Sequence, residues 1–247
     1  MSDAGTNPVG SFKRRYTRAV ANPAAQLLIE GDRLRVPISA FDHAGFRQWV
    51  TSAEFPEGTR ASFVKGEVFL EMSPEAIESH NKVKSEFTSC LIQCMHDRDL
   101  GEVYADGVLL TNIDAELSTE PDLCFASWHT LESSKLRLVE KAQRDDEYVE
   151  IEGTPDLVVE IVSDSSKRKD LTVLRAAYHR AGIAEYWIVD ARGESLRFEI
   201  LSHTDQGYVA RSPEPGPQHS DVFGQAFVLE RSRNRVGRYS YRLSIVD

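Results

Sequence analysis

DLVVEIV, residues 156–162, is a nearly continuous apolar run with the length of a strand that is buried on both faces. A polar loop over 163–169 leads to a helix over 170–181, and Gly182 provides the natural end of that helix. A second apolar run, EYWIVD, covers 185–190. Strand, helix and strand joined by short links form a βαβ unit, in which the two strands pair in parallel. The sequence therefore predicts an α/β core around this unit.

A long amphipathic helix is predicted upstream, over 74–97. Its apolar residues recur at spacings of three and four, namely Ile77, Val83, Phe87, Cys90, Leu91, Cys94 and Met95. We expect Ser73 to cap this helix, with Pro74 at its first position. His80 belongs to the same stripe, so we expect it to face inward.

Shorter elements surround these segments. Two hairpins are predicted, one over 27–36 with a turn at 30–32 and one over 62–72 with a turn at Lys65-Gly66. Single strands are predicted over 103–104, 108–110, 121–125, 196–201 and 239–245. A short helix is predicted over 41–50, and the charged stretch 140–152 is expected to be a surface excursion. Three cysteines, Cys90, Cys94 and Cys124, are too few and too unevenly spaced for a disulfide framework, and no further ligand gives them zinc-finger spacing. We expect them to pack as small hydrophobic residues.

Composition indicates an ordinary globular protein. The chain has 247 residues, of which 41% are hydrophobic and 28% charged. We expect a flexible tail over 1–22, whose basic residues are solvated or contact phosphate, and a single domain over 23–247. No apolar run could span a membrane, and the first 18 residues lack the apolar core of a secretory signal, so a cytoplasmic location is expected. The net charge of −10 argues against broad affinity for nucleic acid, although an enzyme with local basic contacts stays compatible.

Glu160 is the most informative polar residue, because it lies inside the apolar run 156–162. A buried unpaired charge costs several kcal/mol, so such a carboxylate is paired with a cation, protonated or bound to metal. A salt bridge to an arginine or lysine and a functional role are both compatible with this burial.

Two Pro-Asp pairs open strands near Glu160, at Asp122 and Asp156. Asp156 lies about 13 Å from Glu160 along an extended strand, too far for the two to bind one ion. It is expected to cap the start of the strand. Asp122, on an adjacent strand, can approach Glu160, and two converging carboxylates suit Mg²⁺.

These segments resemble the bacterial family described as "putative restriction endonuclease", within the PD-(D/E)XK nuclease superfamily. The closest segments are GEVFLEMSPE with His80, GVLL with PDLCF, and PDLVVEIVSDSS through AGIAEYWIVD, all within 62–192. The resemblance implies a restriction-endonuclease-like fold, with a central mixed sheet flanked by helices and additional antiparallel strands at both ends. The nuclease core would cover 62–192, and a C-terminal strand extension would cover 193–247.

The resemblance also implies roles for individual residues. Asp122 and Glu160 would match the two acids of the motif, and the carbonyl of Ile161 would add a third metal ligand. The lysine of the motif falls on Val162, and the position to which relatives move it falls on Leu174, both apolar here. The remaining candidates are Lys169, Lys167 and Arg175. We choose Lys169, where the loop returns to the end of the strand, although a solvated loop charge is the alternative.

His80 matches a histidine near the start of the long helix in the family, where it could orient a water or a ligand, or simply be hydrogen-bonded in the core. The resemblance thus implies a homodimeric endonuclease that hydrolyses DNA with Mg²⁺, for which Mn²⁺ could substitute. Two alternatives stay open: an inactive module that binds nucleic acid without cutting it, and an assembly role.

Overall fold

The predicted βαβ unit forms the middle of a six-stranded sheet in the computed structural model, which describes residues 26–29, 34–141 and 146–246. The strand order is β14-β13-β12-β11-β8-β5. The strands are β5 (Gly101–Ala105), β8 (Leu123–Ser127), β11 (Leu157–Ile161), β12 (Glu185–Asp190), β13 (Arg197–Thr204) and β14 (Gly207–Ala210). As predicted, β11 and β12 pair in parallel, from Leu157 opposite Glu185 to Ile161 opposite Val189. The other strand pairs are antiparallel, so the sheet is mixed.

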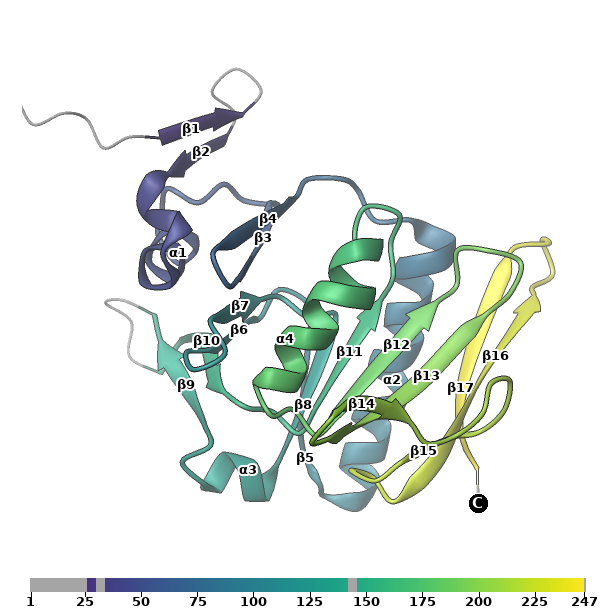
Figure 1. Ribbon diagram of the computed structural model, residues 1–247. Helices are drawn as coiled ribbons and strands as arrows, with labels where there is room; N and C mark the ends of the chain where they lie inside the picture. Colours follow the sequence, from purple (N-terminus) through teal and green to yellow (C-terminus); the bar gives the residue numbers. More distant parts are fainter. Residues whose placement is uncertain (1–25, 30–33, 142–145, 247) are drawn as a thin grey trace, which may run out of the picture. The chain divides into compact units, whose positions relative to one another are not determined.

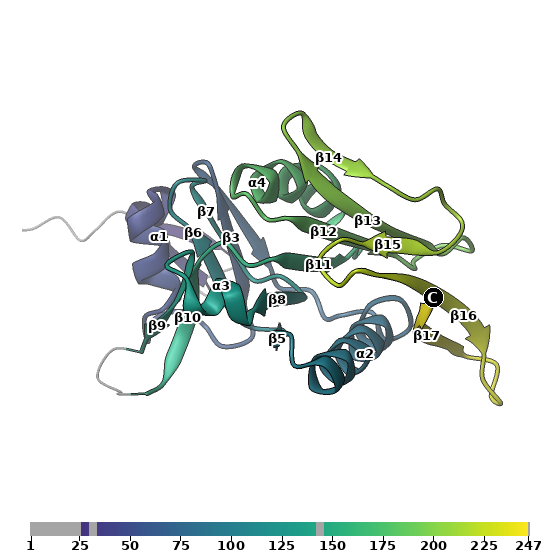
Figure 2. The same ribbon diagram turned by 90° about the horizontal axis from the view of Figure 1, so that it is seen from below.

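Helices α2 (Lys82–Arg98) and α4 (Arg175–Arg180) cover opposite faces of this sheet (Figures 1 and 2). Alternation along β11 sends Val158 into the core on the α4 side and Val159 into the core on the α2 side. A π-helical segment, η3 (Lys169–Leu174), precedes α4. The chain leaves α4 through Gly182 at φ +73°, which confirms the predicted end of this helix.

The start of the long helix differs from the prediction. Regular structure begins with a π-helical turn, η2 (Ile77–Asn81), that has no side-chain cap, so Ser73 does not cap the helix. Ile77 was expected in the core and is 68% exposed. Ala76 has an extended backbone, and the carboxylate of Glu75 before it accepts hydrogen bonds from Lys84 and Arg60, so the helical segment starts only after these residues.

A second mixed six-stranded sheet has the order β4-β3-β7-β6-β10-β9. Its strands are β3 (Arg60–Val64), β4 (Glu67–Glu71), β6 (Leu109–Asn112), β7 (Leu117–Thr119), β9 (Leu136–Glu140) and β10 (Tyr148–Gly153). The predicted hairpin at Lys65-Gly66 joins β3 to β4. Helix α1 (His43–Val50), capped by Asp42, contacts β3 and β7, and α3 (Trp128–Glu132) follows β8.

The expectation of a surface excursion over 140–152 is wrong for β10, which pairs in parallel with β6. In the sequence, the charged residues of this strand gave it the composition of a solvent-exposed segment. In the structure, Ile151 is buried, and the guanidinium of Arg47 binds both Glu150 and Glu152. Neutralisation by a residue distant in the sequence therefore permits these glutamates inside a sheet.

The C-terminal strands form a three-stranded antiparallel sheet of β15 (Gln218–Ser220), β16 (Gln225–Arg233) and β17 (Tyr239–Val246). This confirms the strand predicted over 239–245, and β17 packs along α2.

The N-terminal unit, through Ile38, is separate from the unit over 39–247. It contains the predicted antiparallel pair β1 (Gln26–Ile29) and β2 (Leu34–Pro37), and a 3-10 turn, η1 (Ile38–Phe41), lies at the boundary. The tail predicted over 1–22 lies outside the described residues, and the domain bounds stay a prediction. Within the described ranges, no helix combines the length and the apolar character needed to cross a membrane.

Candidate metal centre

The candidate centre lies at the carboxyl end of β11, where Glu160 is 4% exposed. The hydroxyl of Tyr178 on α4 donates a hydrogen bond to Glu160 Oε1 at 2.5 Å. Burial, together with the charges of Asp170 and Asp122, raises the pKa of Glu160 well above its ordinary value. In the described part of the chain, no lysine or arginine forms an ion pair with Glu160. Its carboxylate is therefore a buried group that a bound cation would stabilise.

Asp122 lies just before β8 on the strand next to β11. The register pairs Leu123 with Val159, which places Asp122 opposite Glu160. Asp122 is 5% exposed, and its Oδ2 accepts a hydrogen bond from the backbone N–H of Ile161 at 2.8 Å. Asp122, Glu160 and Ile161 line one small cavity together. The structure thus brings together the three residues expected to bind metal, while their role as ligands stays a prediction.

His80 faces inward, as its place in the helical stripe predicts. Its Nε2 lies 3.3 Å from Asp122 Oδ2, and its Nδ1 lies 3.5 Å from Glu75 Oε2. Burial alone would lower the pKa of the imidazole, but the hydrogen bond and charge of Asp122 and the charge of Glu75 raise it. His80, Glu75 and Asp122 each offer a ligand atom, and these atoms lie within 4.8 Å of one another. Asp122 therefore belongs to two donor sets, one with His80 and Glu75 and one with Glu160 and Ile161.

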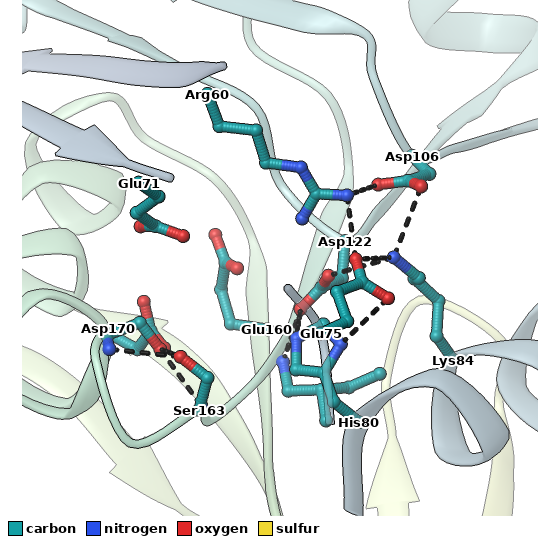
Figure 3. A network of polar contacts seen from close by, with 12 residues as sticks. Arg60, Glu71, Glu75, His80, Lys84, Asp106, Asp122, Glu160, Ser163 and Asp170 are labelled. Carbon is teal, nitrogen blue, oxygen red and sulfur yellow. Dashed lines mark hydrogen bonds and ion pairs between the residues drawn. The ribbon is translucent and has the colours of Figure 1, made fainter. Parts of the chain in front are cut away.

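A network of polar side chains surrounds Asp122 on the side that faces away from Glu160 (Figure 3). Lys84 donates to Glu75, lies 3.2 Å from Asp106 Oδ2 and lies 3.9 Å from Asp122 Oδ1. Arg60 donates to Glu75 Oε1 at 2.8 Å and also to Asp106. Burial opposes the charge of Glu75, but Lys84, His80 and Arg60 lower the pKa of its carboxyl to about 2. Glu75 is therefore a fixed anion at neutral pH.

Lys169 reaches the site from the start of η3. It is buried and forms an ion pair with Glu71. Burial would lower the pKa of its ammonium group, but Glu160, Glu71 and Asp170 raise it, so Lys169 stays charged. Of the other candidates, Lys167 is exposed, and Arg175 donates to the carbonyl of Tyr208 on β14. Lys169 is thus the one of the three that the structure places beside Glu160.

Figure 3 shows Asp170 on the side of Glu160 that faces away from His80 and Lys84. Ser166 donates a hydrogen bond to Asp170 Oδ2, yet burial raises the pKa of this carboxyl to about 7. Its Oδ1 has no hydrogen-bond partner among the described residues, and the same holds for the buried Nδ1 of His80. Glu120, which lines the same cavity, also has a raised pKa because it is buried.

This donor set fits a divalent cation. Seven carboxyl side chains gather in the described site, from Glu71, Glu75, Asp106, Glu120, Asp122, Glu160 and Asp170. Four basic side chains face them, from Arg60, His80, Lys84 and Lys169. Carboxylate and carbonyl oxygens suit Mg²⁺ and Mn²⁺. Two buried atoms of residues that line the cavity, Asp170 Oδ1 and His80 Nδ1, have no hydrogen-bond partner among the described residues. A cleft of about 370 Å³, lined by Arg60, Glu71 and His80 among others, leads to this cavity.

The comparison with protein families decides the assignment. Residues 44–229 match the model of the Uma2 family, which is described as "Putative restriction endonuclease". The chain belongs to this family. A solved structure, described as a "putative nuclease belonging to DUF820" from Anabaena variabilis, aligns with 14% identity and a TM-score of 0.43 over 66% of this chain and 83% of that chain. No curated protein matches the chain.

In this Uma2 family member, Asp156 lies away from the centre and serves the strand start, as expected. Its carboxylate accepts hydrogen bonds from the N–H of Ser127 at 2.7 Å and the hydroxyl of Thr130 at 2.9 Å. The cysteines are free, with Cys94 and Cys124 buried in the core. Val162 and Leu174 are also fully buried, so neither of the positions expected to carry the motif lysine reaches the site.

Sequence reasoning missed several residues of the site. Neither Glu75, in the first turn of the predicted helix, nor Asp106, between two predicted strands, was expected in the site. Lys84 carried a usable signal, because it lies four residues after His80 and therefore shares its helical face. Glu71 lies in a quoted segment of the resemblance, but nothing in the sequence pairs it with Lys169.

Proposed function

We propose that this protein is a metal-dependent endonuclease that hydrolyses phosphodiester bonds of DNA. The observation that carries the proposal is the pair of buried carboxylates, Asp122 and Glu160, that share one cavity with Lys169. Membership of the restriction endonuclease family supports the same reaction class.

Asp122, Glu160 and the carbonyl of Ile161 would hold Mg²⁺, or Mn²⁺ in its place. A bound cation of this kind polarises a phosphate and lowers the pKa of a coordinated water. The hydrogen bond from Tyr178 fixes one oxygen of Glu160, and the N–H of Ile161 fixes one oxygen of Asp122. The protein thus orients both carboxylates before the cation binds, which lowers the entropic cost of binding.

Lys169 would stabilise the negative charge that develops on the scissile phosphate, or position the attacking water. Its ion pair with Glu71 holds the ammonium group near Glu160 while the acids around it keep it protonated. His80 would act as a positioning residue, because Nε2 contacts the oxygen of Asp122 that also binds the Ile161 N–H.

The test is Mg²⁺- and Mn²⁺-dependent cleavage of single-stranded, double-stranded and branched DNA by the full chain. Asp122→Asn and Glu160→Gln keep the shape of each side chain and should each lower the rate at least about 100-fold. Asp156→Asn is the matched control, because it changes the other Pro-Asp pair and should leave cleavage intact. Wild-type rates in both site variants would exclude the proposal.

The second candidate is a module that binds nucleic acid without cutting it. It is favoured by the apolar residues at 162 and 174 and by the engagement of Lys169 with Glu71. It predicts that metal and DNA both bind while no cleavage occurs on any substrate. Calorimetric titration with Mn²⁺, beside the cleavage panel, separates the two candidates. An assembly role predicts neither metal binding nor cleavage.

We also propose that the protein forms a homodimer, as the resemblance to the family implies, and that it resides in the cytoplasm. Sedimentation equilibrium of the full chain tests the dimer: a monomer at micromolar concentration would exclude it. Fractionation of cells that produce the protein tests the location.

A further inference from the structure

The hairpin of β16 and β17 carries a concentration of positive charge that the metal centre does not use. Between residues 231 and 242 it contains five arginines and no acidic residue, within a chain whose net charge is −10. These are Arg231, Arg233, Arg235, Arg238 and Arg242. We call residues 231–242 the arginine hairpin.

Four of these arginines, all but Arg231, are exposed. None of the four forms an ion pair with a carboxylate of the described residues. Two other exposed arginines do form ion pairs: Arg137 binds Glu152, and Arg211 binds Asp221 at 3.0 Å. The arginine hairpin therefore presents exposed guanidinium groups that form no ion pair within the described residues, although the charge of Arg238 contributes to lowering the pKa of Glu78.

The tip of the hairpin is held in one conformation. Asn234 Oδ1 accepts hydrogen bonds from the N–H groups of Val236 at 3.1 Å and Arg238 at 3.0 Å. Gly237 adopts φ +77°, and its N–H donates to the carbonyl of Asn234 at 2.9 Å. A fixed turn lowers the entropic cost of binding a ligand.

Stacking and bracing also order the sides of the hairpin. The guanidinium of Arg233 lies 3.8 Å from the centre of the Tyr239 ring, and that of Arg231 lies 4.4 Å from it. Arg231 also donates to the carbonyls of Gly193 at 2.8 Å and Ala191 at 3.3 Å, in the loop after β12. Arg231 therefore braces the hairpin against the central sheet.

The hairpin is fastened to the helical turn that carries His80. The N–H of Tyr239 donates to Glu78 Oε2 at 2.8 Å, and Lys82 Nζ donates to the carbonyl of Tyr239 at 2.9 Å. Glu78 and His80 both belong to η2. Figure 1 shows the turn between β16 and β17 at the same end of the molecule as the carboxyl ends of β11 and β12, where the metal centre lies.

We propose that the arginine hairpin binds the phosphate backbone of nucleic acid and holds the substrate beside the metal centre. This inference rests on the proposed function for the identity of the substrate. Guanidinium groups donate paired hydrogen bonds to phosphate, and a rigid row of them matches a regularly charged strand. One exposed aliphatic residue at the tip, Val236, offers too little apolar surface to anchor the protein in a lipid bilayer.

The test measures binding of a fluorescein-labelled 20-base-pair DNA duplex to the full chain in EDTA, where metal-dependent cleavage does not occur. The double variant Arg235→Ala/Arg238→Ala should bind on the order of tenfold more weakly. The slope of log affinity against log salt should fall by about 2, because two phosphate contacts are lost. Arg235→Lys/Arg238→Lys should restore most of the slope.

Arg137→Ala/Arg211→Ala is the matched control, because it removes the same charge from exposed arginines that are already paired. It should bind as wild type does. In Mg²⁺, the tip variant should raise the KM for duplex cleavage and leave kcat unchanged.

Wild-type affinity and salt slope in the tip variant overturn the inference, and they leave the nuclease proposal standing if the chain cleaves DNA. Loss of binding in the tip variant of a chain that cleaves nothing supports the hairpin and overturns the nuclease instead. Hairpin-dependent binding to phosphatidylserine vesicles, with none to DNA, overturns the inference as well. Circular dichroism melts check that each variant is folded.

Discussion

Two clusters of buried charge, built from the same kinds of side chain, behave in opposite ways. In the first, Arg47 on α1 binds Glu150 through two hydrogen bonds, of 2.8 and 3.0 Å, and Glu152 through a third of 2.5 Å. Arg137 binds the other oxygen of Glu152 at 2.8 Å. Burial would raise the pKa of Glu152, but the hydrogen bonds from Arg137 and Arg47 outweigh it and lower the pKa.

The second cluster is the candidate metal centre, where burial raises the pKa of Glu160, Asp170 and Glu120. Each carboxylate of the first cluster has a guanidinium partner, whereas those of the second exceed the cations that face them. A matched cluster stabilises the fold, and an unmatched one is maintained at a cost that binding or catalysis can explain. This difference is the reason to propose the second cluster, and not the first, as the functional site.

The largest change in stability should come from removing the guanidinium that neutralises the first cluster. Arg47→Met removes the guanidinium and leaves Glu150 and Glu152 without it, so the free energy of unfolding should fall by about 3 kcal/mol. Urea unfolding followed by circular dichroism measures this change. Arg137→Met is the control, since its side chain is 66% exposed and its loss should cost less than about 1 kcal/mol. Equal effects of the two would contradict the distinction.

The next largest change in stability should come from binding a cation to the acidic side chains of the second cluster. Mn²⁺ or Mg²⁺ at 100 times its dissociation constant should stabilise the wild-type chain by about 2.7 kcal/mol. Urea midpoints with and without the cation report this difference. Asp122→Asn should abolish most of the response, and Asp156→Asn should keep it. A response that is the same in both variants would place the cation elsewhere.

A smaller change in stability, of opposite sign, is expected when each of two glutamates is replaced by glutamine. Glu160→Gln removes a buried carboxylate from its like-charged neighbours, so in EDTA it should raise the free energy of unfolding by about 1 kcal/mol. Glu150→Gln removes a charge-assisted pair and should lower it by about 1.5 kcal/mol. Opposite signs in metal-free urea unfolding support the comparison, and two losses of similar size would refute it.

The smallest effect is a pH dependence of the first cluster. The folded-state pKa of Glu152 is lowered from its ordinary value of 4.5, so the stability it contributes is present above about pH 4.5 and is lost as the pH falls through the folded value. Arg137→Met should reduce this loss, because one of the two groups that lower the pKa is gone. Urea unfolding at several pH values from 3 to 7 measures the difference between the two slopes.

Local patterns in the sequence were sufficient for the central sheet. The apolar runs 156–162 and 185–190 specified β11, β12 and their parallel pairing, because a strand buried on both faces leaves few polar positions. Gly182 marked the end of α4 for a similarly local reason. The second sheet was harder to predict. The charges of β10 looked solvated, since Arg47, which neutralises them, lies about a hundred residues away in the sequence.

The residues of the candidate site also differ in whether the local sequence could identify them. Glu160 could be identified from its own neighbours, and Asp122 from its place at the start of the adjacent strand. Lys84, Arg60 and Glu71 meet these acids only through the fold, since none of them shares a strand or a short motif with Glu160. Glu75 was missed because a glutamate after Ser-Pro is also typical of a helix start. Pairing between distant segments, which a single sequence does not encode locally, decided each of these cases.

The hydrogen bond between Asp122 and the N–H of Ile161 also bears on how such proteins evolve. A chain that lost its nuclease activity would still need an acceptor for this buried donor, so selection for folding alone would retain the aspartate. Among the described residues, Glu160 accepts its hydrogen bond from the Tyr178 side chain and none from the backbone, and we expect its burial to destabilise the fold. In a survey of descendants, the glutamate should therefore disappear soon after activity does, while the aspartate persists. Comparing how many sequences of a lineage keep each of the two residues would indicate when catalysis was lost.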